Sequence, residues 1–172
     1  FMRLLEKAIQ EWTASEIVQS IQLKQIEPIE VAQLYVDFIH KKEPEIRAWE
    51  FFSPEVFLDQ VTKNQNAEGK LIGVPFGVKD IFNTKGYPTQ MGSPIWKDFI
   101  AGNNARVVDH LLWEGASLIG KTVTAEFAVH SPGKTLNPVN NKHIVGTSSS
   151  GSAAAVASGM APITLGTQTA GS

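Results

Sequence analysis

The chain has 172 residues, of which 42% are hydrophobic and 19% charged, and its formal net charge is −2. This balance predicts a folded protein with a sizeable core rather than a disordered chain. The absence of cysteine excludes disulfides, thiolate metal ligands and thiol nucleophiles. The basic residues are scattered, and no apolar run approaches the roughly 20 residues of a membrane span, so we expect neither nucleic acid nor membrane as a partner. Glu6, Lys7 and Glu11 make the first residues unlike a signal peptide, so we expect a cytoplasmic protein.

The N-terminal part of the chain predicts helices with one strand between them. The run Thr13-Ala14-Ser15-Glu16 fits a capping box and predicts a helix over 14–24. Pro28 suits the first turn of a second helix, which the apolar spacing extends to about residue 42. Residues 46–52 are typical of a strand, and Pro54 begins a short helix that ends in a polar run.

The rest of the chain alternates strands with helices. Buried strands are predicted at 71–82, 116–122 and 161–169. Helices are predicted at 105–114, stopped by Gly115, and at 152–158, capped by Gly159. Polar loops are predicted at 83–94 and 130–143. This alternation predicts an α/β protein with a sheet covered by helices, and residues 1–172 show neither an internal repeat nor a domain boundary.

Residues 146–172 place several serines on glycine- and alanine-rich backbone, which three kinds of segment could explain. A phosphate-binding loop would need a Gly-Lys-Ser/Thr sequence, and the lysine is missing. A flexible linker would not carry the apolar runs AAAVA and APITLG. The remaining interpretation is a serine nucleophile, because TQTAGS follows a predicted strand as a tight turn whose N–H groups can converge on an oxyanion.

A serine hydroxyl needs a base, and the residues alone leave the choice of base open. Lys79 ends a predicted buried strand, where loss of hydration would lower its pKa and make a neutral amine accessible. The pattern by itself favours the alternative that Lys79 pairs with Asp80 and turns outward, because strongly perturbed lysines are rare. The histidines are further candidates, two on predicted helices and two flanking the loop 130–143: His40, His110, His130 and His143.

Several separate motifs, in order, resemble the amidase signature family. They are GVPFGVKD (73–80), TKGYPTQMGS (84–93), EGASLIGKTVTAEFA (114–128), NP (137–138), GTSSSGSAAAVASGM (146–160) and LGTQTAGS (165–172). The match runs from about Leu71 to Ser172 and continues more weakly through the two N-terminal helices. The resemblance implies a mixed, mostly parallel sheet sandwiched between helices. Residues 1–172 would be the N-terminal part of one such domain, ending at the nucleophile motif.

The resemblance also implies a Ser–cis-Ser–Lys triad. Lys79 would be the base, Ser148 the bridging serine with a cis peptide bond, and Ser172 the nucleophile. The oxyanion would bind to backbone N–H groups near Ser172, those of Thr169, Ala170 and Gly171. Neither a metal nor an organic cofactor is implied.

Three positions depart from the family pattern. Thr147 stands where a second glycine is usual, Val145 where proline is frequent, and Ala170 where glycine is common. A β-branched residue at 147 would oppose a positive φ. The neighbouring hydroxyls of Ser149, Ser150 and Ser152 would hydrogen bond within the loop or cap the next helix, and Ser149 would be the one able to orient the bridge.

The implied function is an amidase that hydrolyses a small-molecule carboxamide to an acid plus ammonia or an amine through a seryl acyl-enzyme. One alternative is the A subunit of a glutamine-dependent tRNA amidotransferase, which passes ammonia to a partner protein. Another is a catalytically inactive member used as a binding scaffold, although the retention of all three triad residues speaks against it. We allow for a homodimer. We expect residues 1–172 alone to be inactive, because in the family the rest of the sheet and most of the pocket follow the nucleophile.

Overall fold

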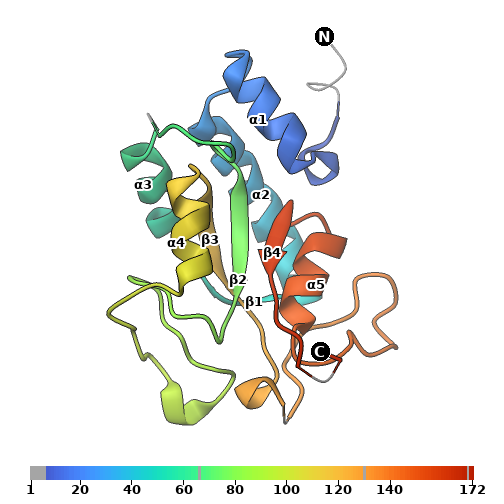
Figure 1. Cartoon of the computed structure of the whole chain (residues 1–172). Helices are drawn as coiled ribbons and strands as arrows, with labels where there is room; N and C mark the ends of the chain where they lie inside the picture. The colour runs from blue at the N-terminus through green and yellow to red at the C-terminus, as the bar shows by residue number, and fades with distance from the viewer. Residues whose placement is uncertain (1–6, 66, 130, 170) are drawn as a thin grey trace.

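A four-stranded mixed sheet forms the centre of the computed structural model, which describes residues 7–65, 67–129, 131–169 and 171–172 (Figure 1). The strand order is β1-β3-β2-β4, and the strands are β1 Trp49–Phe52, β2 Pro75–Lys79, β3 Ser117–Thr122 and β4 Ile163–Leu165. β1 runs antiparallel to β3, whereas β2 is parallel to both β3 and β4. The predicted mixed, mostly parallel sheet is therefore confirmed.

Helices cover both faces of this sheet. They are α1 Ala14–Gln22, α2 Pro28–Ile46, α3 Pro54–Lys63, α4 Arg106–Trp113 and α5 Ser150–Ala157, with 3-10 turns η1 Ile9–Glu11, η2 Pro94–Trp96 and η3 Glu126–Ala128. α2, α3 and α5 pack on one face around Ile119 of β3, and α4 packs on the other against Phe76 and Val78 of β2. α1 joins α2 in a second core that includes Tyr35. None of the described helices combines the length and apolarity needed to cross a bilayer.

Local hydrogen bonds fix the start of α1, where the sequence predicts it, and the end of α2. The Thr13 hydroxyl accepts the Glu16 N–H at 3.2 Å, and the Glu16 carboxylate accepts the Thr13 N–H at 2.7 Å, which completes the capping box of α1. α2 runs four residues beyond the predicted end, because Ile46 is buried in the core and Arg47 ends the helix in the left-handed conformation. The Glu43 carboxylate then accepts the N–H groups of Ala48 and Trp49 and ties this helix end to β1.

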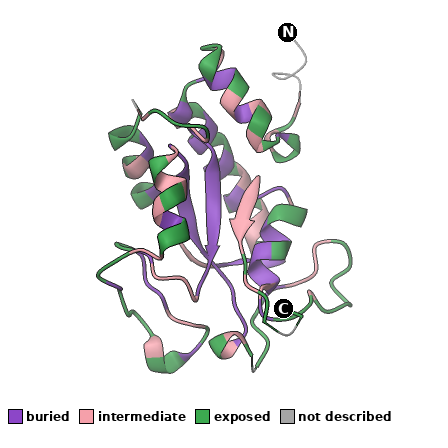
Figure 2. Ribbon diagram, viewed as in Figure 1, coloured by how far each residue is buried: buried purple, intermediate pink, exposed green. Residues whose placement is uncertain are grey.

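The predicted strand 161–169 is shorter and more exposed than expected. β4 covers only residues 163–165, and each of them is half-buried (Figure 2). Within the described residues β4 pairs with β2 alone, so it borders the sheet instead of lying inside it. β2, in contrast, is buried along its whole length, and a Cβ at Gly77 would lie 2.9 Å from the Trp49 ring.

A β-bulge interrupts the regular pairing of β2 with β3 near the middle of the sheet. Phe76 pairs with Leu118 and Gly77 with Gly120, so Ile119 is an extra residue in β3. After the bulge, Val78 pairs with Lys121 and Lys79 with Thr122. Paired residues of neighbouring strands point to the same face of a sheet, so Lys121 lies on the α4 face and Thr122 on the α5 face.

A buried ion pair lies at the carboxyl end of β2, on the face opposite Lys79. Asp80 Oδ1 is 3.0 Å from Lys121 Nζ, and both side chains are fully buried. The three N–H groups of Lys121 donate to the Phe82 and Pro88 carbonyls and to the Thr89 hydroxyl, so its attraction to Asp80 is mainly coulombic. Asp80 also accepts the Gln90 N–H at 3.0 Å. The pair therefore holds the loop 80–91 against the sheet.

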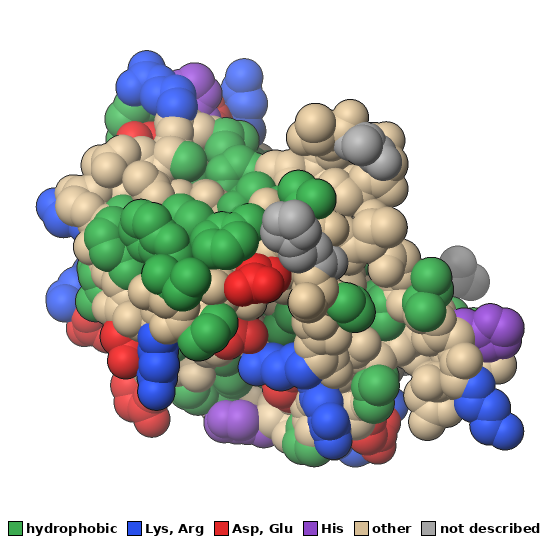
Figure 3. Space-filling model, turned by 90° about the horizontal axis from the view of Figure 1, so that it is seen from below, with side chains coloured by type: hydrophobic (Ala, Val, Ile, Leu, Met, Phe, Trp, Pro, Cys, Tyr) green, Lys and Arg blue, Asp and Glu red, His purple; other side chains and the backbone are tan. Residues whose placement is uncertain are grey.

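The lower end of the molecule, where the parallel strands finish, carries exposed hydrophobic side chains (Figures 1 and 3). They belong to the loops around η2 and η3 and comprise Ile95, Phe99, Ile100, Phe127 and Val129. As predicted, 83–94 is largely irregular, with η2 beginning only at its last residue, and the described part of 130–143 contains no helix or strand.

The buried pair predicts an asymmetric stability effect. Lys121→Met leaves the Asp80 carboxylate buried without a cation, which should lower the free energy of unfolding by about 3 kcal/mol or more. The double variant Asp80→Asn with Lys121→Met removes both charges and should recover most of that loss. Urea unfolding of the protein at its natural length measures both values.

The matched control is the exposed pair between Lys63 and Asp59 on α3. Lys63→Met should change the free energy of unfolding by less than about 1 kcal/mol, because water screens exposed charges. Equal effects of Lys121→Met and Lys63→Met would contradict a structural role for the buried pair.

Candidate active site

Lys79 is the last residue of the central strand and its side chain is fully buried on the α5 side of the sheet. Its Nζ lies within hydrogen-bond distance of three hydroxyls from two other segments: Ser148 at 2.6 Å, Thr167 at 2.7 Å and Ser149 at 3.0 Å. Ser148 and Ser149 immediately precede α5, and Thr167 follows β4. The structure thus gathers hydroxyls from two motifs 18 or more residues apart around one amine.

Burial lowers the pKa of Lys79 from 10.5 to about 8, because the ammonium loses its hydration. The interpretation in which Lys79 pairs with Asp80 is wrong. Successive residues of a strand point to opposite faces, so Asp80 turns away and faces Lys121. Around Lys79 the partners are neutral hydroxyls, which can accept an N–H or donate an O–H as the amine changes protonation state.

The segment before α5 adopts its turn through Gly146, whose φ is +97°. Thr147 is not among the described residues with positive φ, so its β-branched side chain is accommodated without left-handed strain. Its hydroxyl donates to the Gly171 carbonyl at 3.1 Å and links this segment to the chain end. Ser148 is buried, and α5 begins two residues earlier than predicted.

The expected cis peptide bond at Ser148 is not present. None of the peptide bonds in the described residues is cis, and both bonds of Ser148 lie in that part of the chain. Trans is the favoured state of a bond that does not precede proline, and the trans segment already brings the Ser148 hydroxyl to 2.6 Å from Lys79.

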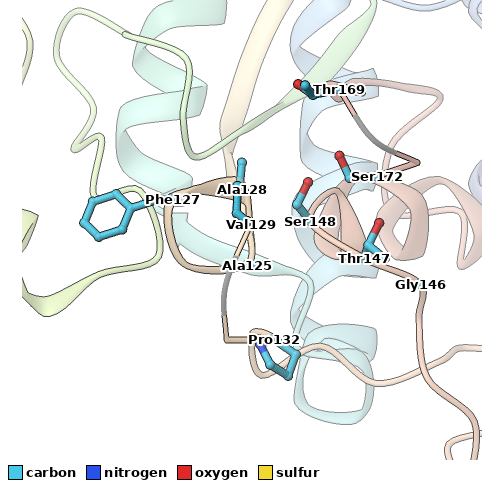
Figure 4. A pocket seen from close by; sticks show the side chains of 10 residues that line it. All are labelled: Ala125, Phe127, Ala128, Val129, Pro132, Gly146, Thr147, Ser148, Thr169 and Ser172. Atoms are coloured by element: carbon cyan, nitrogen blue, oxygen red, sulfur yellow. The ribbon is translucent and has the colours of Figure 1, made fainter.

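Ser172 lies beside Ser148 at one pocket, with the two hydroxyls on the same wall (Figure 4). The Ser172 hydroxyl donates to the Thr167 carbonyl at 3.2 Å, and it forms no hydrogen bond with the Ser148 hydroxyl in this structure.

The pocket has a volume of about 420 Å³ and lies beyond the carboxyl ends of the parallel strands, where ligands of open α/β sheets usually bind. One wall is polar and includes Thr147, Ser148 and Ser172, whereas the segment 125–129 supplies apolar groups opposite (Figure 4). Among the described residues, no group of three or more acidic or histidine side chains is arranged to hold a metal ion.

The other predicted site residues differ in whether they lie at the pocket. Thr169 lines the pocket, and Gly171 has a φ of +96° with open space around it, whereas Ala170 lies outside the described residues. The described histidines are exposed and line no part of the pocket: His40 on α2, His110 on α4 and His143 in the loop. His130 lies outside the described residues.

Sequence reasoning missed Thr167, which touches more of the site than any other residue in its segment. Its hydroxyl contacts Lys79, its carbonyl accepts hydrogen bonds from Ser149 and Ser172, and its N–H donates to Ser149. The available signal was its place between Gly166 and the predicted oxyanion turn, but a threonine in a polar loop does not by itself indicate a contact with a base.

Comparison with known proteins identifies the family of the chain. A profile of the amidase family matches residues 30–172. The A subunit of glutamyl-tRNA(Gln) amidotransferase from Chloroflexus aggregans is 37% identical over 93% of this chain, and its counterpart from Dehalococcoides mccartyi strain CBDB1 is 39% identical over 87%. The chain spans 35% and 33% of these relatives, about a third of their length.

Two solved structures share the fold at low sequence identity. A bacterial aryl acylamidase of the amidase signature family superposes with a TM-score of 0.84 and 27% identity, over 92% of this chain and 36% of that one. A peptide amidase from Stenotrophomonas maltophilia gives a TM-score of 0.82 and 26% identity, over 90% and 35%. Because the family profile covers most of the residues, the chain belongs to the amidase family, the amidase signature enzymes.

Proposed function

We propose that the chain carries the acyl-transfer machinery that cleaves a carboxamide, with Ser172 as nucleophile, Ser148 as proton relay and Lys79 as base. The observation that carries this proposal is the buried Lys79 amine, 2.6 Å from the Ser148 hydroxyl and without a carboxylate partner among the described residues. A lysine with a pKa of about 8 supplies a useful fraction of neutral amine near neutral pH.

The reaction starts with neutral Lys79, which takes the proton of Ser148 as Ser148 takes the proton of Ser172. The Ser172 oxygen attacks the amide carbon, and the oxyanion is stabilised by backbone N–H groups in the turn 169–172. The C–N bond breaks as the relay returns a proton to the nitrogen, which leaves as ammonia or an amine. Water then gives a proton to Lys79 through the same relay, and its oxygen attacks the acyl carbon of the ester. The bond from that carbon to the Ser172 oxygen breaks, the relay returns the proton to Ser172, and the acid leaves.

Within this chemistry we favour the A subunit of a glutamine-dependent tRNA amidotransferase over a free-standing amidase. The two curated relatives at 37% and 39% identity carry that name, whereas the solved amidases compared above are 26–27% identical. The substrate would then be the side-chain carboxamide of glutamine, and the ammonia would pass to a partner protein. A free-standing amidase with a small-molecule amide substrate, and a scaffold without activity, are the alternatives that the experiments below distinguish.

The nucleophile can be identified with a serine-reactive fluorophosphonate. We expect one labelled site, Ser172, in the protein at its natural length, and we expect Ser172→Ala to abolish the label. Lys79→Met should slow labelling by about 100-fold or more, because loss of a general base typically costs that much. Peptide mass mapping locates the site.

Ser131→Ala provides the control, since Ser131 is exposed near the pocket outside the proposed relay. It should label at the wild-type rate. A label that survives Ser172→Ala would refute Ser172 as the nucleophile, and a folded wild-type protein that never labels would favour the scaffold.

The lowered pKa of Lys79 predicts the pH dependence of the reaction. Only the neutral amine can accept the Ser148 proton, so kcat/KM should rise about tenfold per pH unit below pH 8 and level off above it. An ordinary lysine would place this limb near 10.5. Steady-state kinetics between about pH 6 and 10 measure the limb, and a rate independent of pH below 8 would contradict Lys79 as the base.

Substrate preference separates the two enzyme alternatives. An amidotransferase should release ammonia from glutamine with a kcat/KM at least about tenfold above that for acetamide, because a hydrogen-bonding site rejects analogues that leave its polar groups unpaired. Coupled ammonia assays measure both rates, with Ser172→Ala as the blank. Equal or reversed preference would favour a free-standing amidase.

A further inference from the structure

The three hydroxyls around Lys79 cannot all play the same part when the amine is neutral. An ammonium has three N–H groups and can donate one to each of Ser148, Ser149 and Thr167. A neutral amine has two N–H groups and one lone pair, so one hydroxyl must turn round and donate. Which hydroxyl donates decides whether the Lys79 lone pair is free to take the proton of Ser148.

Ser149 is already committed as an acceptor. Its O–H donates to the Thr167 carbonyl at 3.0 Å, and its oxygen accepts the Thr167 N–H at 3.2 Å as well as Lys79 at 3.0 Å. One donor and two lone pairs are thereby used, which is the full capacity of a hydroxyl. One N–H of Lys79 therefore points to Ser149 in either protonation state.

The remaining N–H and the lone pair are shared between Ser148 and Thr167. If Thr167 accepts the N–H, the lone pair faces the Ser148 hydroxyl and can take its proton. If Thr167 donates to the lone pair instead, Lys79 donates to Ser148 and cannot act as its base. The two oxygens lie at similar distances from Nζ, 2.6 and 2.7 Å, so the distances alone do not decide which of the two states is adopted.

We propose that Thr167 is a positioning residue whose hydroxyl accepts an N–H of Lys79 and thereby directs the lone pair of the neutral amine at Ser148. This inference rests on the proposed function of Lys79 and Ser148. The Thr167 backbone is held by two hydrogen bonds to Ser149, and its carbonyl also accepts the Ser172 hydroxyl at 3.2 Å. A single residue thus contacts the base and the nucleophile from opposite ends of the relay.

Close packing keeps Thr167 in place. A Cβ at the preceding Gly166 would lie 3.2 Å from the Ser149 Oγ, so the chain passes tightly over the serine segment. No charged group on the described elements packed against Lys79 competes for its amine. β4 and α5 contribute apolar, glycine, serine and threonine residues, and β3 contributes Thr122 on this face. Asp80 and Lys121 pair with each other on the other face, and Glu50 of β1 pairs with Lys134.

Thr167→Val in the protein at its natural length tests the proposal, because it removes the hydroxyl and keeps the backbone contacts and side-chain shape. We expect kcat to fall about tenfold or more while KM changes less than about threefold. The acid limb of kcat/KM should move to lower pH by roughly half a unit, because a hydrogen bond that favours the ammonium has been lost. Thr167→Ser, which restores the hydroxyl, should return both values to near wild type.

A merely structural role for Thr167 would lower kcat without moving the acid limb, and that result would overturn the proposal. Wild-type kcat and pH profile in Thr167→Val would overturn it as well. A faster Thr167→Val enzyme would mean that the hydroxyl competes for the lone pair, the opposite of the proposed part.

A readout without turnover separates this inference from the proposed function. The ¹³Cε resonance of Lys79, assigned by its absence in Lys79→Met, reports the pKa directly by NMR titration. Thr167→Val should lower that pKa and Thr167→Ser should not. Full activity of Ser172→Ala would reject the proposed function. An unchanged Lys79 pKa in Thr167→Val would reject the role of Thr167.

Discussion

The site depends on an amine that is buried without a counter-ion among the described residues. Lys79 is fully buried, and the groups within hydrogen-bond distance of its Nζ are hydroxyls. A carboxylate there would hold the lysine as an ammonium, because opposite charge favours the charged form. Hydroxyls instead serve both forms, since each can accept from an ammonium or donate to a free amine. These partners therefore suit the proton transfer that we propose for Lys79.

The sheet provides this environment by separating charge between its faces. Lys79 and Asp80 are neighbours in sequence, but the alternation of a strand sends them to opposite sides. Lys121 neutralises Asp80 on the α4 face, and the small residues of α5 allow the serine segment to approach the other face. The carboxyl ends of β2 and β4 then bring Lys79 and Thr167 together beside the pocket. The pair of Asp80 and Lys121 thus keeps a carboxylate away from Lys79, although neither residue lines the pocket.

The parts of the fold that could be predicted are those set by contacts close in sequence. The Thr13–Glu16 capping box and the proline at the start of α3 indicated the helix starts correctly. The end of α2 and the exposure of β4 depend on packing against distant segments, which local patterns do not record. The same holds at the site. Asp80 is adjacent to Lys79 in the chain and therefore suggests itself as a partner, whereas the actual neighbours lie 69 to 88 residues away. The turn TQTAGS suggested a serine nucleophile from the residue pattern, whereas the roles of Ser148 and Ser172 came from the resemblance.

The single extra residue at Ile119 determines which lysine meets which group. If β2 and β3 paired without the bulge, Ile119 would pair with Gly77, so Lys121 would pair with Lys79 and project toward α5 while Thr122 faced the side of Asp80. Two amines would then crowd one hydroxyl cluster, and a carboxylate would be left in the core with no cation. The β-bulge in β3 therefore keeps the two buried lysines on opposite faces of the sheet, because a regular ladder through the same residues would place both amines on the α5 face.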